Sequence, residues 1–261
     1  MRLPIYQVDA FADAVFAGNP AAVVPLESWL PDERLLAIAA ENNLSETAFV
    51  VPAGADYAIR WFTPAVEVDL CGHATLAAAF AVATAIDPGR ERIDFRSRQA
   101  GRLTVERQGD LFVLDFPSRP AARTDVPPGL VAALGGVEPE AVLRARDILV
   151  VCRDDETVRA IQPDMARLAA LGDAVCVTAP GTDGADFVSR FFAPAQGIPE
   201  DPVTGSAHCT LIPYWAARLG KTKLSARQVS ARGGALACEQ RGDRVKIGGK
   251  AVLYLEGTIQ V

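Results

Sequence analysis

The chain has 261 residues, of which 50% are hydrophobic and 22% are charged, so it can bury one large core or two smaller ones. This balance excludes extensive disorder, a collagen-like repeat and a small disulfide scaffold. The formal net charge of −6 argues against non-specific binding to nucleic acid or to an anionic membrane.

The N-terminal segment and the cysteines indicate a cytoplasmic, reduced protein. Residues 1–5 lead directly into strand-like sequence, without the apolar core and cleavage site of an export signal. The longest apolar run, residues 74–86, is too short to cross a bilayer. The five cysteines include no CxxC pair, and two histidines are too few for a His-rich metal site. We therefore expect no metal site, although counting residues does not exclude a carboxylate-bound magnesium ion.

The first half of the chain predicts one amphipathic helix, several short strands and one apolar helix. The amphipathic helix begins at Pro31 and stops at Asn42–Asn43. Residues 72–86 contain no Asp, Glu, Lys or Arg, so a helix there lacks a polar face and should be buried. The strands are expected at residues 57–63, 92–98, 102–107 and 111–116, with a Gly109–Asp110 turn between the last two.

The second half repeats the first. The segment RWFTPA at residues 60–65 recurs as RFFAPA at residues 190–195, an offset of 130 residues, and matches further along occur at an offset of 133. We place the three extra residues in a stretch that includes Glu200–Asp201–Pro202. The corresponding elements are strands at residues 187–192, 226–230, 235–240 and 245–248 and an uncharged helix at residues 205–217.

This duplication predicts an α+β fold with two pseudo-symmetric domains. In each domain we expect a curved, mainly antiparallel sheet wrapped around a buried central helix. The domains are expected at residues 1–117 and 130–261, with a proline-rich linker at residues 118–129. The last strand can cross to the first domain.

Both central helices begin with glycine, at Gly72 and Gly205, and helix N-termini present unpaired N–H groups and partial positive charge. If the two N-termini face each other, they would stabilise a carboxylate or an enolate-like intermediate without a metal. The alternative is that these glycines only form tight turns before buried helices.

Several side chains near these turns could carry chemistry. Glu46 stands between a helix stop and an apolar strand, which favours an acid/base beside the core over an exposed loop glutamate. Asp201 could orient a substrate amine or hydroxyl, pair with His73, or only cap the turn. Cys71 could act as a base or nucleophile at a helix N-terminus, but a packed small residue is favoured, because Thr204 stands at the duplicate position. His208, in the first turn of a buried helix, fits a core histidine.

Five spaced motifs resemble the PhzF-like phenazine-biosynthesis isomerase family, in the same order through both halves. They are Asp9–Ala10–Phe11, residues 16–23 (FAGNPAAV), residues 43–49 (NLSETAF), residues 71–75 (CGHAT) and residues 200–208 (EDPVTGSAH).

The resemblance implies a fold of the diaminopimelate-epimerase type with a cofactor-free active site between two similar domains. It implies that Glu46 is the general acid/base, that His73 and Asp201 act on the substrate, and that a homodimer can form. It also implies that Ser45, Ser206 and the N–H groups of Gly72 and Gly205 bind the substrate.

These observations predict a cofactor-independent isomerase that shifts a proton within a small carboxylate-bearing cyclic or amino-substituted metabolite. One alternative is an epimerase or racemase, although Thr204 replaces the second thiol that two-thiol epimerisation requires. A second is an acyl transferase or hydrolase that depends on Cys71. A third is a protein that binds a small molecule without turning it over.

Overall fold

The computed structural model describes residues 1–261. The chain divides into two compact units: unit 1 comprises Met1–Asp115 and Gly248–Val261, and unit 2 comprises Phe116–Ile247. Residues 118–129, expected as a linker, belong to unit 2 in this division, and the end of the chain belongs to unit 1. The sequence left the crossing of the last strand open, because strand periodicity does not reveal which sheet a strand joins.

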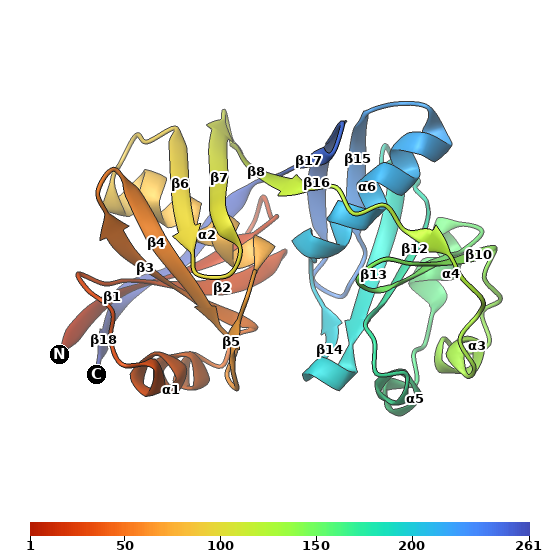
Figure 1. Cartoon of the computed structure of the whole chain (residues 1–261), viewed down its shortest axis with the longest axis horizontal. Helices are drawn as coiled ribbons and strands as arrows, with labels where there is room; N and C mark the ends of the chain where they lie inside the picture. The colour runs from red at the N-terminus through yellow and green to blue at the C-terminus, as the bar shows by residue number, and fades with distance from the viewer. The chain divides into compact units, whose positions relative to one another are not determined.

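Unit 1 is built mainly from antiparallel strands. Its sheet has the order β18-β1-β2-β3-β4-β6-β7-β8, in which only the β2–β3 and β4–β6 pairs are parallel. Figure 1 shows β18, drawn in blue, beside the red strand β1. The strands are β1 (Arg2–Ala10), β2 (Asn19–Pro25), β3 (Glu46–Ala53), β4 (Asp56–Phe62), β5 (Glu67–Val68), β6 (Arg92–Ser97), β7 (Gly101–Gln108), β8 (Leu111–Pro117) and β18 (Ala251–Gln260).

The expected uncharged helix of unit 1 is buried. Helix α2 (Gly72–Ala81) contacts β1, β2 and β3, and nine of its ten residues are buried. It continues as a π-helical segment, η1 (Val82–Ile86), so the predicted range is helical throughout. A largely apolar helix of this kind gains most of its stability from burial against the sheet.

The amphipathic helix of unit 1, α1 (Asp32–Asn42), joins the two parallel strands β2 and β3. It buries Leu35 and Ile38 against a core that includes Phe49. It ends at Asn43, whose φ of 49° is left-handed and whose N–H bonds to the Ala39 carbonyl. The return through α1 makes β2 and β3 parallel and pairs Glu46, the first residue of β3, with Ala21, the third residue of β2.

Unit 2 repeats this arrangement around helix α6 (Gly205–Leu219), whose buried residues include Trp215, stacked on Phe187 at 5.7 Å between ring centroids. Its sheet has the order β9-β10-β11-β12-β13-β15-β16. The strands are β9 (Ala122–Arg123), β10 (Ala141–Arg144), β11 (Ile148–Val151), β12 (Val175–Pro180), β13 (Phe187–Ala193), β14 (Ile198–Asp201), β15 (Lys223–Gln228), β16 (Gly234–Arg241) and β17 (Arg244–Gly249). The shorter helices are α3 (Leu130–Ala133), α4 (Asp155–Ala160), α5 (Met165–Ala170) and the 3₁₀ turn η2 (Pro194–Gln196).

Strand pairing follows the same sequence of directions in both units. From β1 to β7 in unit 1, the five pairs of neighbouring strands are antiparallel, parallel, antiparallel, parallel and antiparallel. The five pairs of neighbouring strands from β10 to β16 in unit 2 have the same directions in the same order. The strand expected at residues 226–230 instead runs from Lys223 to Gln228. The chain passes from one unit to the other within β8 and again within β17.

An arginine–glutamate pair is duplicated and shows where the halves differ in length. Arg60 binds both carboxylate oxygens of Glu67 at 2.6 Å, and Arg190 binds those of Glu200 at 2.8 and 3.0 Å. The arginines are 130 residues apart and the glutamates 133, so the three extra residues lie between Ala195 and Glu200. The expected stretch, which included Glu200–Asp201–Pro202, therefore extended too far along the chain, because sequence matching alone did not connect Glu200 with Glu67.

None of the helices combines the length and the apolar character that crossing a membrane requires.

Candidate active site

Three polar side chains of unit 1 meet where β2, β3 and α2 begin. Asn19 is the first residue of β2, Glu46 is the first residue of β3, and His73 is in the first turn of α2. The parallel pairing of β2 and β3 sets Glu46 opposite Ala21, two residues after Asn19. All three are buried, with exposed fractions of 0% for Asn19, 8% for Glu46 and 4% for His73.

The His73 ring lies between a carboxylate and an amide. Its Nε2 is 3.2 Å from Glu46 Oε2, and its Nδ1 is 3.2 Å from Asn19 Nδ2 and 3.5 Å from Cys71 Sγ. Although Glu46 Oε2 and His73 Nε2 are close, they are not aligned as a hydrogen bond, and neither atom has another hydrogen-bond partner. A buried carboxylate oxygen and a ring nitrogen are thus held in reach of a proton that either could carry.

Burial and charge act oppositely on the pKa of His73. Burial lowers this pKa, but the side chains of Cys71 and Glu46 outweigh it, so that the pKa of His73 lies well above its ordinary value. Burial and the negative charge of Glu46 raise the pKa of Cys71 to about 11, so its thiol is uncharged at neutral pH. The raised pKa of His73 therefore depends on two neighbouring side chains, Cys71 and Glu46.

Protonation of His73 also decides how Asn19 lies. An imidazolium donates from both ring nitrogens, so the Asn19 amide must then present its oxygen to Nδ1. Amide oxygen and nitrogen are placed from the hydrogen-bond network, and a half-turn of the amide exchanges them. Asn19 can thus accept from the protonated ring or donate to the neutral ring, which suits a histidine that changes its proton count.

Helix α2 directs N–H groups toward the same corner. Its first intrahelical bond runs from Thr75 N–H to the Cys71 carbonyl, so the N–H groups of Gly72 and His73 lie before the first turn closes. The Thr75 hydroxyl donates to the same carbonyl. Ser45, the half-buried residue before Glu46, completes this part of the expected site. Glu46, His73, Gly72 and Ser45 therefore all lie on adjoining segments of unit 1.

In unit 2, Asp201 ends β14 and Thr204 precedes the first residue of α6. The Thr204 hydroxyl donates to Asp201 Oδ2, and Thr204 N–H donates to Gln228 Oε1 at 2.9 Å. Gln228 Nε2 donates to the Asp201 carbonyl at 2.7 Å. Asp201 thus takes part in holding its turn, as one of the sequence hypotheses stated; its pairing with His73 stays a prediction. Gly205 is buried and Ser206 is half-buried at the start of α6.

His208 is a fully buried core histidine, as expected. Its Nδ1 lies 2.8 Å from the Thr204 carbonyl, which can only accept, so Nδ1 carries the proton. Its Nε2 is buried without a hydrogen-bond partner. Burial lowers the pKa of His208 to about 4, and the ring is neutral at physiological pH.

We expect His208 to reduce stability in acid. The unfolded chain binds a proton on this residue below pH 6.5, whereas the folded protein does not until about pH 4. Stability is therefore fully present above pH 6.5 and is lost as the pH falls toward 4, by about 2 kcal/mol at pH 5. Urea unfolding at pH 7.5 and pH 5.0 measures this loss.

The matched variant is His208→Asn, which can still donate to the Thr204 carbonyl but cannot titrate. Its stability should change less between the two pH values than that of the wild type. The other histidine, His73, acts in the opposite direction, because its raised pKa contributes stability below pH 6.5 that is lost as the pH rises. Equal pH slopes in the two proteins would contradict the neutral, buried state of His208.

One group of side chains could hold a metal ion. Glu46, Cys71 and His73 each offer one ligand atom, and these atoms lie within 4.8 Å of one another. Oxygen, sulfur and nitrogen ligands in this combination suit zinc. The sequence count, which considered His-rich sites and CxxC pairs, did not consider such a mixed set.

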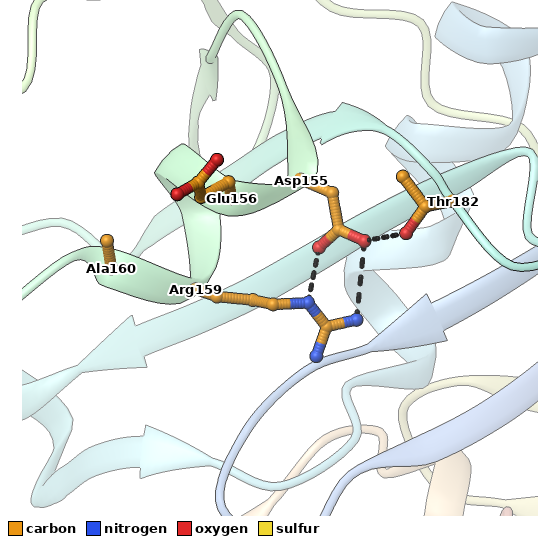
Figure 2. Close-up of a pocket in the computed structure, with 5 residues that line it drawn as sticks. All are labelled: Asp155, Glu156, Arg159, Ala160 and Thr182. Carbon is orange, nitrogen blue, oxygen red and sulfur yellow. Dashed lines mark hydrogen bonds and ion pairs between the residues drawn. The ribbon is translucent and has the colours of Figure 1, made fainter.

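Unit 2 also has an open pocket of about 450 Å³ beside α4. Figure 2 shows that Asp155 faces Arg159 and Thr182, and its carboxylate accepts at 2.6 Å from Arg159 Nε and from the Thr182 hydroxyl. Burial raises the pKa of Asp155, but these hydrogen bonds outweigh burial and lower it. The carboxylate is thus neutralised by partners, and none of the expected site residues lines this pocket.

Two residues of these networks were not identified as functional from the sequence. Asn19 was noted only as part of a motif, and its contact with His73 depends on the pairing of β2 with β3. Gln228 was not singled out. It occupies a buried position of β15, where buried and exposed residues alternate, and a polar residue at such a position is the signal that could have identified it.

The sequence and the structure are both similar to those of known proteins. A family model described as "Phenazine biosynthesis-like protein" (PhzC-PhzF) matches residues 8–257. An uncharacterized isomerase of Pseudomonas aeruginosa is 56% identical over 262 residues, covering 100% of both chains. A crystal structure of a PhzF-family phenazine biosynthesis protein from Enterococcus faecalis has a TM-score of 0.96 and 50% identity, with 100% of both chains covered.

A more distant likeness concerns the fold alone. A hydroxyproline epimerase from Agrobacterium vitis is 12% identical with a TM-score of 0.62, over 99% of this chain and 92% of its own. The predicted α+β, epimerase-like fold is confirmed.

Proposed function

Because the chain belongs to the phenazine biosynthesis-like (PhzC-PhzF) family, we propose that it is a cofactor-independent isomerase. It moves a proton within a small carboxylate-bearing cyclic or amino-substituted metabolite. The observation that carries this proposal is the buried Glu46–His73 pair, 3.2 Å apart, beside the first N–H groups of α2.

Glu46 is the general base in this proposal. A carboxylate buried in contact with an imidazolium can take a proton from a substrate carbon and return it at another carbon. His73 lies 3.2 Å from the Glu46 carboxylate and can donate a hydrogen bond as negative charge develops on the substrate. Asn19 keeps the ring in place in either protonation state.

Substrate binding is assigned to the residues around the two helix starts. In unit 1, the Gly72 N–H group and the Ser45 hydroxyl are suited to an anionic or amine-bearing substrate. In unit 2, Asp201, Gly205 and Ser206 are suited to the same kinds of group. The Gln228 bonds support this assignment for unit 2, because they fix the turn from which α6 begins.

The state of Cys71 argues against two of the alternative activities. With a pKa of about 11, its thiol is protonated at neutral pH and is a poor nucleophile for acyl transfer. Two-thiol epimerisation needs a second cysteine, and the duplicate position is Thr204. A single carboxylate base that serves two carbons needs neither.

The proposal is tested by incubating the protein with a panel of small cyclic and amino-substituted carboxylates in deuterated water. Deuterium incorporated at a carbon of one compound, followed by NMR, marks proton transfer by the enzyme. Thermal stabilisation by a compound without exchange at any carbon would indicate a binding protein that turns nothing over and would contradict the proposal.

A further inference from the structure

We propose that Glu46, Cys71 and His73 form a binding site for one thiophilic divalent metal ion such as Zn²⁺, and that the bound ion blocks proton transfer. The site is a second, inhibitory use of residues that the proposed function employs as acid/base machinery, and the blocking effect rests on that function.

The ligand chemistry favours this class of ion. A cysteine sulfur, a histidine nitrogen and a carboxylate oxygen are the three ligand types of zinc sites, and three protein ligands leave a fourth position open. Mg²⁺ prefers oxygen ligands and would find one carboxylate here. The site should therefore select Zn²⁺, Co²⁺ or Cd²⁺ and exclude Mg²⁺.

The geometry is close to what one ion needs. Cys71 Sγ and His73 Nδ1 are 3.5 Å apart, near the separation of roughly 3.5 Å between neighbouring ligands of a tetrahedral zinc ion. The three ligand atoms lie within 4.8 Å of one another. A shift of about 1 Å by the flexible Glu46 side chain would close the set around the ion.

The surroundings provide two further reasons. The three residues are each more than nine-tenths buried, and Glu46 Oε2, one of the ligand atoms, lacks an aligned hydrogen bond. Unsatisfied buried polar atoms gain free energy from a ligand that satisfies them. Coordination releases the thiol proton and the extra imidazolium proton to solvent, and the thiolate and the carboxylate then balance the 2+ charge of the ion.

The test is a titration of the full chain with Co²⁺, followed by absorption. We expect one equivalent to produce a thiolate-to-cobalt charge-transfer band that Zn²⁺ removes and excess Mg²⁺ does not. The Cys71→Ala variant should lack the band, and the matched Cys238→Ala variant, which removes another buried thiol, should keep it.

A second variant covers the case in which Cys71→Ala does not fold. Glu46→Gln keeps the volume of the side chain and should weaken Co²⁺ binding about tenfold or more, because even loss of an outer contact costs that much. A wild-type protein without the band, a band that persists in Cys71→Ala, or unchanged affinity in Glu46→Gln would overturn the site.

The effect on turnover is measured separately. Zn²⁺ should stop solvent-deuterium exchange by the wild type, and a chelator should restore it; exchange at an undiminished rate with the ion bound would overturn the inhibitory role. Absence of exchange in the metal-free protein would count against the proposed function and not against the site, because the cobalt spectrum is recorded without substrate.

Discussion

Glu46→Gln should lower the rate of deuterium incorporation into the substrate by about 10²- to 10⁴-fold, the usual contribution of a general acid/base. The change replaces one carboxylate oxygen with an amide nitrogen and keeps the shape of the side chain. Substrate binding should survive, because the assigned binding groups at Gly72, Ser45 and α6 are untouched. Exchange followed by NMR measures the rate, and ligand-induced thermal stabilisation measures binding.

The same variant has a readout that needs no substrate. Without the negative charge of Glu46, the pKa of His73 should fall from its raised position, because one of the two side chains that raise it is lost while burial still lowers it. NMR titration of the ring nitrogens measures this change. The matched control is Glu41→Gln, which alters an exposed glutamate of α1 and should change neither the exchange rate nor His73. Exchange at the wild-type rate in Glu46→Gln would remove Glu46 from the role of base.

The sequence identified residues of the candidate site but not the contacts between them. Glu46 was identified because it stands between a helix stop and an apolar strand, and the structure buries it there at the first position of β3. His73 was identified through the start of the uncharged helix. The contact between Glu46 and His73 could not be predicted from the sequence. It depends on the register of β2 against β3 and on where α2 meets the sheet.

Long-range hydrogen bonds account for the rest of what the sequence did not predict. The amide of Gln228 lies 24 residues from Thr204 along the chain, and no local pattern connects a strand residue with a turn at that distance. The last segment of the chain is a similar case: the sequence allowed its strand to cross to the first domain, but its place beside β1 is set by pairing with that strand. A local segment of sequence can indicate which residues could carry chemistry. It does not show which distant residues they bond to or which strands pair, because these contacts form only in the folded sheet.

Arg60 illustrates how the duplicated framework supports the site. The sequence showed that the motif containing Arg60 is repeated, but it did not identify Glu67 as the partner of Arg60. Arg60 is 2% exposed, and it binds Glu67 through two hydrogen bonds and Asp32 through a third at 2.8 Å. Glu67 begins β5, which leads directly to Cys71 and the start of α2. The ion pair therefore holds in place the segment that leads to His73.

We expect Arg60→Met to destabilise the protein by about 3 kcal/mol, because it leaves the Glu67 carboxylate without its bidentate partner. The value is at the low end for a buried pair, since the Glu67 side chain is 27% exposed and water can replace part of the lost contact. Arg60→Lys should be intermediate, because an ammonium keeps the charge and cannot form the two parallel bonds. Urea unfolding measures all three proteins.

The double variant Arg60→Met/Glu67→Met separates the ion pair from simple packing. With both charges removed, no carboxylate is left without a partner, so the double variant should be more stable than Arg60→Met alone. A double variant as unstable as the single one, or a single variant within about 1 kcal/mol of wild type, would show that the pair contributes little. If the pair does fasten β5, Arg60→Met should also lower the pKa of His73, because its distance to Glu46 depends on where α2 begins.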